Sequence, residues 1–257
     1  MNWDDEQLLR LEVDAIYGLT EEPGRRLPGV RDAKVRAVWA WSPRARVFAV
    51  RPGTEEPDSG PEEPGGGSGE PGGGPEASGS GPAAVAQPYA PGEPPRALER
   101  LADSLGPAAG EVSGGPSYVF PAALAARPPA SLPLITSDES GKRAAAALTR
   151  PGNWETGEWA ELIAGELGEW AMAVHDDAPV SICFSPATNA TAAEAGIWTR
   201  ADFRGRRLAP AVVAAWSERE RRNKEVLFYS TSAANHASQS VARSLGLTPL
   251  GWIWTLR

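Results

Sequence analysis

A long segment from Pro52 to Pro95 places the strongest constraint on how this chain can fold. It reads PGTEEPDSGPEEPGGGSGEPGGGPEASGSGPAAVAQPYAPGEPP and contains almost no branched apolar residues. Such a composition cannot bury enough apolar surface to offset the conformational entropy that ordering would remove. The segment is therefore predicted to be a disordered loop or linker, and the folded structure is expected to come from the residues on either side of it.

The chain of 257 residues is accordingly divided into four predicted regions. These are an N-terminal α/β region (1–51), the linker (52–95), a continuation of the N-terminal region (96–150) and a C-terminal domain (151–257). Before the linker, apolar spacing predicts a helix from Asp4 to Tyr17, and residues 33–41 and 45–51 are expected to form a hairpin. After the linker, helices are expected near 96–105 and 137–148, with a strand near 117–120.

The C-terminal region has a more regular pattern. A short helix is predicted from about Glu158, followed by three strands in GEWAMAVHD, APVSICFSP and AAEAGIWTR. A helix from about Leu208 to Arg222 follows, and then a strand in EVLFYSTS, a helix in NHASQSVARSLG and a final strand in GWIWTLR. Short turns between consecutive strands favour an antiparallel meander, and a strand–helix–strand return favours a parallel crossover. The predicted fold class is α/β (α+β), with a mixed, mostly antiparallel sheet flanked by helices.

Composition excludes several classes of function. The formal net charge of −8 argues against non-specific binding to nucleic acid or to anionic membranes. One cysteine excludes an internal disulfide framework, and the two histidines lack the spacing of a metal site, so no metal is predicted. No secretory signal is evident, and no apolar run approaches about 18 residues, so the expected location is the cytoplasm. The sequence does not decide whether the protein forms a homodimer.

The stretch from Phe203 to Val213, FRGRRLAPAVV, is a basic turn that leads into an apolar helix. A helix N-terminus presents unpaired N–H groups and the positive end of the helix dipole. Gly205 lets the backbone approach a ligand, and Pro210 lacks an N–H that would be unpaired in any case. These features favour binding of a phosphate or pyrophosphate, and the alternative is a solvated helix cap. A nucleic-acid site is disfavoured because the following basic run is interleaved with Glu.

The turn and its surroundings resemble the GNAT acetyltransferase superfamily over residues 158–257, with the most specific motifs in residues 194–246. The family signature is Arg or Gln, two residues, Gly, one residue, and then Gly or Ala at the start of a helix. Arg204 and Ala209 match its ends, whereas Arg207 stands where the signature has its internal Gly. A second resemblance is Asn235 after the next strand, with Leu-Gly-Leu at 245–247 in the place of the family's Leu-Gly-Phe.

The resemblance implies acetyl-CoA as co-substrate. Its pyrophosphate is expected on the backbone N–H groups of the basic turn, which are those of Arg204, Gly205, Arg206, Arg207, Leu208 and Ala209. The pantetheine arm is expected to pair like an extra strand with Ile197, Trp198 and Thr199, so the strands GIWT and LFYS should separate there. Asn235 and Ser238 are expected to reach the pantetheine or the phosphates of the cofactor.

The transfer reaction also needs proton-transfer groups and an oxyanion donor. Glu194 is the predicted general base, the alternative being a surface carboxylate at the start of a strand. The backbone N–H of Trp198 or Thr199 is expected to bind the oxyanion. Many family members place a tyrosine acid where this chain has Ala242, so Tyr229 is the predicted substitute, the alternative being a core aromatic. The hydroxyls of Ser230 and Ser238 are further candidates, and a thiolate can also leave without an acid.

Three functional hypotheses follow. The first is an N-acetyltransferase that transfers acetyl directly from acetyl-CoA to the amine of a small molecule or peptide in a ternary complex. The second is a non-catalytic acyl-CoA-binding or regulatory module on the same fold, favoured by Arg207 and Ala242. The third is an interaction protein whose linker recruits partners. His175, His236 and Cys183 are predicted to be structural or solvent-exposed rather than catalytic.

Overall fold

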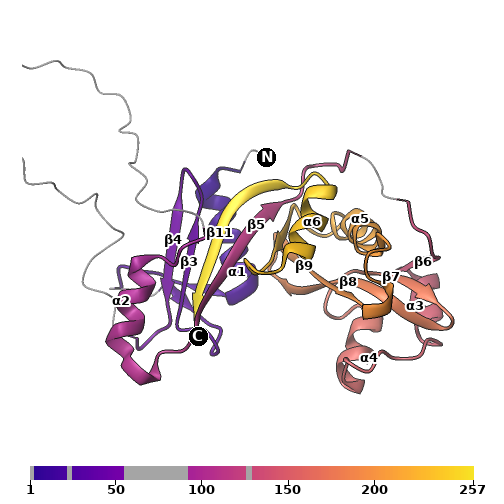
Figure 1. The fold of residues 1–257 in the computed structure, drawn as a ribbon, viewed down its shortest axis with the longest axis horizontal. Coiled ribbons are helices and arrows are strands. Elements are labelled where there is room, and N and C mark those ends of the chain that lie inside the picture. The colour runs from indigo at the N-terminus through magenta and orange to yellow at the C-terminus, as the bar shows by residue number, and fades with distance from the viewer. Residues whose placement is uncertain (1–2, 22–24, 55–91, 126–128) are drawn as a thin grey trace, which may run out of the picture.

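The computed structural model describes residues 3–21, 25–54, 92–125 and 129–257, and their centre is one nine-stranded sheet (Figure 1). The strand order is β4-β3-β11-β5-β10-β9-β8-β7-β6, and β1 and β2 form a separate pair. The strands are β1 Leu19–Thr20, β2 Gly29–Val30, β3 Ala37–Trp41, β4 Arg46–Val50, β5 Val112–Val119, β6 Leu134–Thr136, β7 Trp170–His175, β8 Ala178–Thr188, β9 Ala192–Thr199, β10 Val226–Ser230 and β11 Thr248–Leu256. The helices are α1 Asp5–Tyr17, α2 Arg96–Leu105, α3 Glu139–Ala145, α4 Thr156–Ala164, α5 Leu208–Glu220 and α6 His236–Ser244, with 3₁₀ turns η1 Gly106–Ala108 and η2 Ala201–Phe203.

Strands from both ends of the chain share this sheet. The C-terminal strand β11 lies between β3 and β5, and β5 is antiparallel to both β10 and β11. Within the described ranges the parallel neighbours are β9 and β10, which α5 connects, so the predicted parallel crossover is confirmed. The predicted fold class is also confirmed. The domain boundary at residue 151 stays a prediction, and the sheet contains strands from both sides of it.

Most predicted elements are present, with some differences. The helix over 4–17, the hairpin of β3 and β4, and the C-terminal alternation of helices and strands are confirmed. Strand β5 begins at Val112, earlier than expected, and β1, β2 and β6 were not predicted. The sequence VSGGPSYV has weak intrinsic strand preference because of its glycines and proline, and its extended form depends on the two neighbours that pair with it. Residues 55–91, which hold most of the predicted linker, lie outside the described residues.

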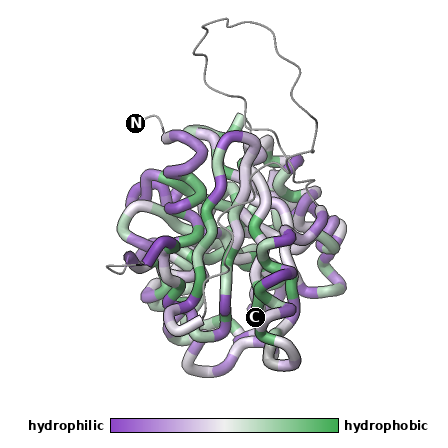
Figure 2. The backbone as a smooth tube through the Cα atoms, turned by 90° about the vertical axis from the view of Figure 1, so that its left-hand side faces the viewer, coloured by the Kyte–Doolittle hydropathy of each residue, from purple (hydrophilic) through white to green (hydrophobic). Residues whose placement is uncertain are grey.

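Helices cover both faces of the sheet. Alternation along β9 and β10 shows the division: Ala192 and Phe228 pack on the side of α1, whereas Ala193 and Leu227 pack on the side of α5 and α6. In Figure 1, α5 and α6 lie in front of the sheet and α1 lies behind it. Figure 2 shows hydrophobic strand segments passing through the interior, with hydrophilic segments concentrated in loops and outer helical turns.

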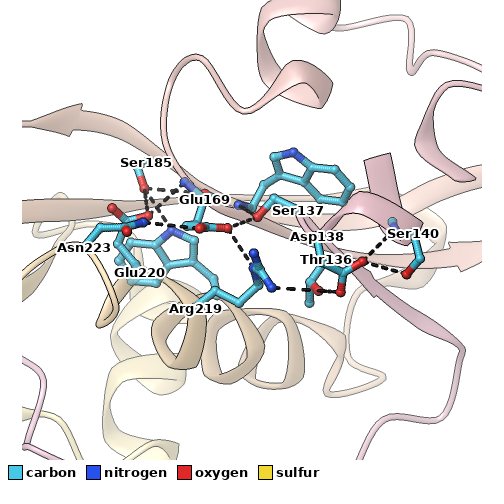
Figure 3. Close-up of polar contacts among 12 residues, drawn as sticks. Thr136, Ser137, Asp138, Ser140, Glu169, Ser185, Arg219, Glu220 and Asn223 are labelled. Atoms are coloured by element: carbon cyan, nitrogen blue, oxygen red, sulfur yellow. Dashed lines mark hydrogen bonds and ion pairs between the residues drawn. The ribbon is translucent and has the colours of Figure 1, made fainter. Parts of the chain in front are cut away.

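A polar network holds the C-terminal end of α5 against β7 and β8 (Figure 3). Glu220 is buried and accepts hydrogen bonds from the backbone N–H of Glu169 at 2.8 Å and from the hydroxyl of Ser185 at 3.1 Å. Arg219 donates to Glu169 at 2.7 Å, and the indole N–H of Trp216 donates to Ser185 at 3.0 Å. Because these contacts fix one end of a 13-residue helix, they also fix the direction in which its N-terminus points.

Candidate functional site

Strands β9 and β10 are paired over their first residues only and then separate. Their parallel pairing ends at Glu194 and Phe228, although β9 continues along β8 to Thr199 and β10 continues along β5 to Ser230. The separation predicted for GIWT and LFYS is therefore observed. Residues 196–199 are partly exposed, whereas residues 192–195 are buried.

The hydrogen-bond phase of β9 shows which backbone groups face the gap. The N–H of Arg200 donates to the carbonyl oxygen of Val180 at 2.9 Å, so that pair belongs to the β8–β9 ladder. Because the pattern alternates, the N–H of Trp198 also faces β8, whereas those of Ile197 and Thr199 face the side from which β10 has departed. Of the two predicted oxyanion donors, only Thr199 thus has its N–H on the open edge, and the expectation for Trp198 is corrected.

The basic turn lies between this edge and the first turn of α5. Arg204, Gly205, Arg206 and Arg207 are all exposed, whereas Leu208 is buried and anchors the start of the helix. No side chain makes a capping hydrogen bond at this helix N-terminus. The guanidinium of Arg204 donates to the carbonyl oxygen of Thr199 at 3.4 Å, which ties the turn to the open edge. The first-turn N–H groups therefore have no side-chain cap within the described structure.

Arg207 occupies a backbone conformation that suits glycine. Its φ of 58° and ψ of 23° are left-handed, and it lies where the resemblance expects Gly. A residue that has a Cβ atom is less stable in the left-handed conformation than in the right-handed one by about 1–2 kcal/mol. Glycine does not have this penalty, which is a physical reason for a glycine at this position. Arg207 is exposed.

One arginine of the basic turn and one that precedes the turn stack on the same aromatic ring. The guanidinium groups of Arg200 and Arg206 lie 4.4 and 4.5 Å from the ring centroid of Phe203, which is itself buried. Such cation–π contacts restrain long side chains that would otherwise be mobile. They hold the base of the turn in a defined shape and keep positive charge beside the N-terminus of α5.

Glu194 lies at the point where the strands part. It is 6% exposed, and its Oε1 accepts hydrogen bonds from the backbone N–H and, at 2.8 Å, from the hydroxyl of Ser230. Its Oε2 is buried without a hydrogen-bond partner within the described structure. Burial raises the pKa of Glu194 to about 7, against the opposing effect of the two bonds from Ser230. The alternative of a surface carboxylate is wrong, because Glu194 is buried.

A second buried carboxyl group, from Glu12, lies close enough to interact with Glu194. Glu12 is fully buried in α1, and the hydroxyl of Ser117 lies 2.6 Å from both of its oxygens. Burial, and then the charge of Glu194, raise the pKa of Glu12. Glu12 was not predicted as a site residue, although the sequence contains a signal. Glu12 lies three residues after Leu9 and four after Leu8, on the apolar face of the predicted helix.

Tyr229 points to the opposite face of the sheet from Glu194. Its hydroxyl lies 2.7 Å from the hydroxyl of Ser238 and donates to the carbonyl oxygen of that residue at 3.1 Å. Asn235 is the N-cap of α6, and its side chain accepts from the N–H of Ser238 at 3.0 Å. The structure thus brings Tyr229, Ser238 and Asn235 together. Burial raises the pKa of Tyr229, so its phenol is neutral at neutral pH.

The remaining candidates have structural positions. Cys183 is fully buried, and burial raises the pKa of its thiol, so it is a core residue. His175 ends β7, with its ring centroid 5.0 Å from that of Phe203. His236 is exposed in the first turn of α6, and Ala242 is buried in the same helix.

Residues 166–250 match the family model described as GNAT acetyltransferase, so the predicted resemblance of the C-terminal half is confirmed. No curated protein matches the sequence. Within the described part of the chain, no helix is both long and apolar enough to cross a membrane.

Several solved structures are similar to parts of this chain. A GNAT-family protein from Novosphingobium aromaticivorans is 18% identical, with a TM-score of 0.42, covering 58% of this chain and 65% of its own. An acetyltransferase of the GNAT family from Colwellia psychrerythraea is 17% identical, with a TM-score of 0.43, covering 58% and 57%. A tandem GNAT protein from the clavulanic acid biosynthesis pathway is 16% identical, with a TM-score of 0.43, covering 66% and 60%. The alignments therefore span less than two thirds of the length of each of these three proteins.

Proposed function

We propose that this protein is an N-acetyltransferase that transfers acetyl from acetyl-CoA to an amine of a small molecule or peptide. The observation that carries the proposal is the separation of β9 and β10 after Glu194 and Phe228, beside a helix N-terminus that no side chain caps. An open strand edge next to uncapped N–H groups suits a ligand that has an amide-containing arm and a diphosphate. The family match over 166–250 supports the same ligand class.

In this proposal the cofactor occupies two adjoining parts of the site. The diphosphate binds the turn and the first N–H groups of α5, where the dipole, Gly205 and the exposed arginines favour negative charge. The pantetheine arm pairs with the open edge of β9 at Ile197. Asn235 and Ser238, at the start of α6, are the residues proposed to contact the pantetheine arm or the phosphates.

The proposed reaction is a direct attack of the acceptor amine on the thioester of acetyl-CoA. The neutral amine nitrogen bonds to the thioester carbonyl carbon, the carbon–sulfur bond breaks, and the sulfur departs with the electron pair as a thiolate. Glu194 takes the proton that the amine loses, and a pKa of about 7 suits a base at neutral pH. In this proposal the N–H of Thr199 binds the oxyanion. Tyr229, whose phenol is neutral, is the proposed proton donor to the thiolate. Because burial raises its pKa, it is a weak acid, and the thiolate can also leave without a proton.

A non-catalytic acyl-CoA-binding module is the second candidate. It is favoured by buried Ala242 where the resemblance expects a tyrosine, and by the hydroxyl of Tyr229, which is already hydrogen-bonded to Ser238. Both candidates predict cofactor binding, and only the first predicts turnover. A panel of amines, followed by release of free thiol, separates them.

The test of the proposed site is a thermal-shift titration with coenzyme A, ADP and pantetheine. Ligand at about 100 times its dissociation constant should add about 2.7 kcal/mol to the free energy of unfolding. We expect coenzyme A to give the largest shift, ADP a smaller one and pantetheine the least. Replacing Gly205 by Val, which adds a branched side chain at a φ of 75°, should remove the shifts with coenzyme A and ADP. A chain that coenzyme A does not stabilise would contradict both candidates.

A further inference from the structure

The face of the sheet that carries Glu194 is not covered evenly by helices. Alternation along β9 places Glu194, Gly196 and Trp198 on this face. Helix α1 packs over the first part of β9, and α3 and α4 pack in a separate cluster with β7 and β8. Glu194 is buried, whereas Gly196 and Trp198 are partly exposed. The second half of β9 is therefore the part of this face that a ligand can reach beside Glu194.

Two rings from β8 lie over β9 at Gly196. Phe184 is directly opposite Gly196 in the antiparallel ladder. A Cβ atom on Gly196 would lie 2.9 Å from the ring of Phe184 and 2.9 Å from the ring of Pro186, so the missing side chain lets both rings cover the strand. Because Gly196 is two residues from Glu194, an apolar surface begins roughly 6–7 Å along the strand from the carboxylate position.

The ring of Phe184 is held in place by a buried tryptophan. Its centroid lies 5.0 Å from that of Trp154, with the two planes at 70°. Trp154 in turn has an edge contact with Trp159 of α4, at 6.5 Å. Phe184 itself stays partly exposed. A ring fixed in this way presents a defined aromatic surface, and little side-chain entropy is lost when a ligand packs on it.

Trp198 adds a second aromatic surface with a free polar end. It lies opposite Ile182 and packs against the cluster of α3, α4, β7 and β8. Its indole N–H has no hydrogen-bond partner among the described residues and is open to solvent. The buried indole N–H of Trp216, by contrast, donates to Ser185 at 3.0 Å. An indole with an apolar body that is packed and an N–H that is exposed to solvent is typical of a tryptophan at a binding surface.

The charges on this face favour a cationic ligand. Glu194 accepts both donors of Ser230 at Oε1, and its Oε2 is buried without a partner within the described structure. That oxygen can accept a hydrogen bond from an amine directly or through one water molecule. The positive side chains of the basic turn lie beyond Thr199, where the proposed phosphate site is. An acceptor with hydroxyl or charged groups in place of an apolar part would leave them unpaired against Phe184 and Trp198.

We propose that the acceptor is a primary amine that carries an aromatic ring within about 7 Å of its nitrogen, and that Phe184 and Trp198 are the residues that select it. The nitrogen lies towards Glu194, and the ring packs on Phe184 and Trp198. This inference rests on the proposed function for the role of Glu194 as base. Binding of the ring does not depend on turnover, so it can be measured separately.

The first test is an NMR titration that follows the indole N–H signal of Trp198, which Trp198→Phe identifies by its loss. The probes are 2-phenylethylamine, 2-cyclohexylethylamine and glucosamine, each with and without saturating coenzyme A. We expect 2-phenylethylamine to shift this signal and to bind about 2–10-fold more tightly than 2-cyclohexylethylamine, because aromatic pairs contribute beyond the area that they bury. Glucosamine should leave the signal unchanged.

The second test replaces one aromatic ring. Phe184→Leu should remove the preference for 2-phenylethylamine over 2-cyclohexylethylamine. The matched control is Phe48→Leu on β4, which removes a ring that lies 5.4 Å from Trp39 in a different cluster and should keep the preference. If Phe184→Leu does not fold, Trp198→Leu should remove the preference in the same way. In turnover assays, Phe184→Leu should raise KM for 2-phenylethylamine by about the same factor with little change in kcat.

Three results would overturn the proposal. These are equal affinities of the wild type for the two apolar amines, tighter binding of glucosamine than of 2-phenylethylamine, and equal effects of Phe184→Leu and Phe48→Leu on the preference. Failure of the proposed function has a different signature. In that case 2-phenylethylamine shifts the Trp198 signal and Phe184→Leu removes the preference, but no amine is acetylated.

Discussion

Glu194 of β9 accepts both the backbone N–H and the hydroxyl of Ser230 of β10, two residues beyond the last paired position of that strand. In a continued parallel ladder, the N–H of Ser230 would bond to the backbone of β9. The carboxylate takes that N–H instead. The Glu194 side chain therefore accepts the N–H of Ser230 where the strands part. The backbone edge of β9 beyond that point is left free for another partner.

Replacing Glu194 by Gln should lower kcat/KM by about 10²–10⁴-fold, because positioned general bases contribute about that factor. Binding of coenzyme A should change little, since the open edge and the turn are intact. Below the Glu194 pKa of about 7 the wild-type rate should fall with the fraction of ionised base, and the variant should lose this dependence. The measurement is steady-state kinetics across pH with any acceptor that turns over. An unchanged kcat/KM would exclude Glu194 as the base.

Glu194→Gln should make the protein more stable than the wild type at alkaline pH. The pKa of Glu194 is raised from 4.5 to about 7, so the folded protein binds this proton more tightly than the unfolded chain does. Wild-type stability should therefore fall as pH rises from about 4.5 through about 7, with a total loss on the order of 3 kcal/mol. Glu194→Gln should lack this loss, so denaturant unfolding should find the two proteins similar at pH 5 and the variant more stable at pH 8. A wild type that becomes more stable over this interval would contradict the prediction.

The rate of amide hydrogen exchange should alternate between fast and slow from residue to residue along β9. In the free protein, the N–H groups of Ile197 and Thr199 should exchange faster than that of Trp198, because only the last is in the ladder with β8. Addition of coenzyme A should slow Ile197 and Thr199 selectively. Residue-resolved exchange by NMR gives this comparison within one sample. Equal protection of all three amides in the free protein would mean that the edge is already closed.

Replacing Arg207 by Gly should stabilise the protein by about 1 kcal/mol, since glycine adopts a φ of 58° without the penalty of a side chain. The control is Arg207→Ala, which removes the same charge but keeps the Cβ and should not show the gain. Chemical denaturation of both variants separates the backbone effect from the effect of charge. A glycine variant no more stable than the alanine variant would argue against backbone strain at this position.

Replacing Glu220 by Ala should destabilise the protein by about 2 kcal/mol, because the backbone N–H of Glu169 and the hydroxyl of Ser185 would both lose an acceptor in a buried position. Glu225→Ala, at an exposed position close by in sequence, is the matched control and should be nearly neutral. Equal midpoints for the two variants in thermal unfolding would show that the network around Glu220 adds little.

Sequence patterns predicted most local elements correctly because those elements depend on local chemistry. Alternating apolar residues in APVSICFSP and AAEAGIWTR marked two strands, and the basic turn marked the start of α5. The family resemblance supplied the place where β9 and β10 separate. Glu194 was found in the same way, from its position on a recognised strand. Glu12 also left a local trace, since a carboxylate on the apolar face of α1 is unusual, but that trace does not identify its partner.

Residue types and their spacing were thus enough to determine the helices, most strands, the fold class and the basic turn. The tertiary structure alone decided that β5 lies between β10 and β11, that Trp198 and Thr199 direct their N–H groups to opposite sides, and that Glu12 and Glu194 interact. The physical reason is that these relations join residues far apart in sequence. Glu12 meets Glu194 through Ser117 and Ser230 only because four separate segments pack on one face, and no local propensity encodes that arrangement.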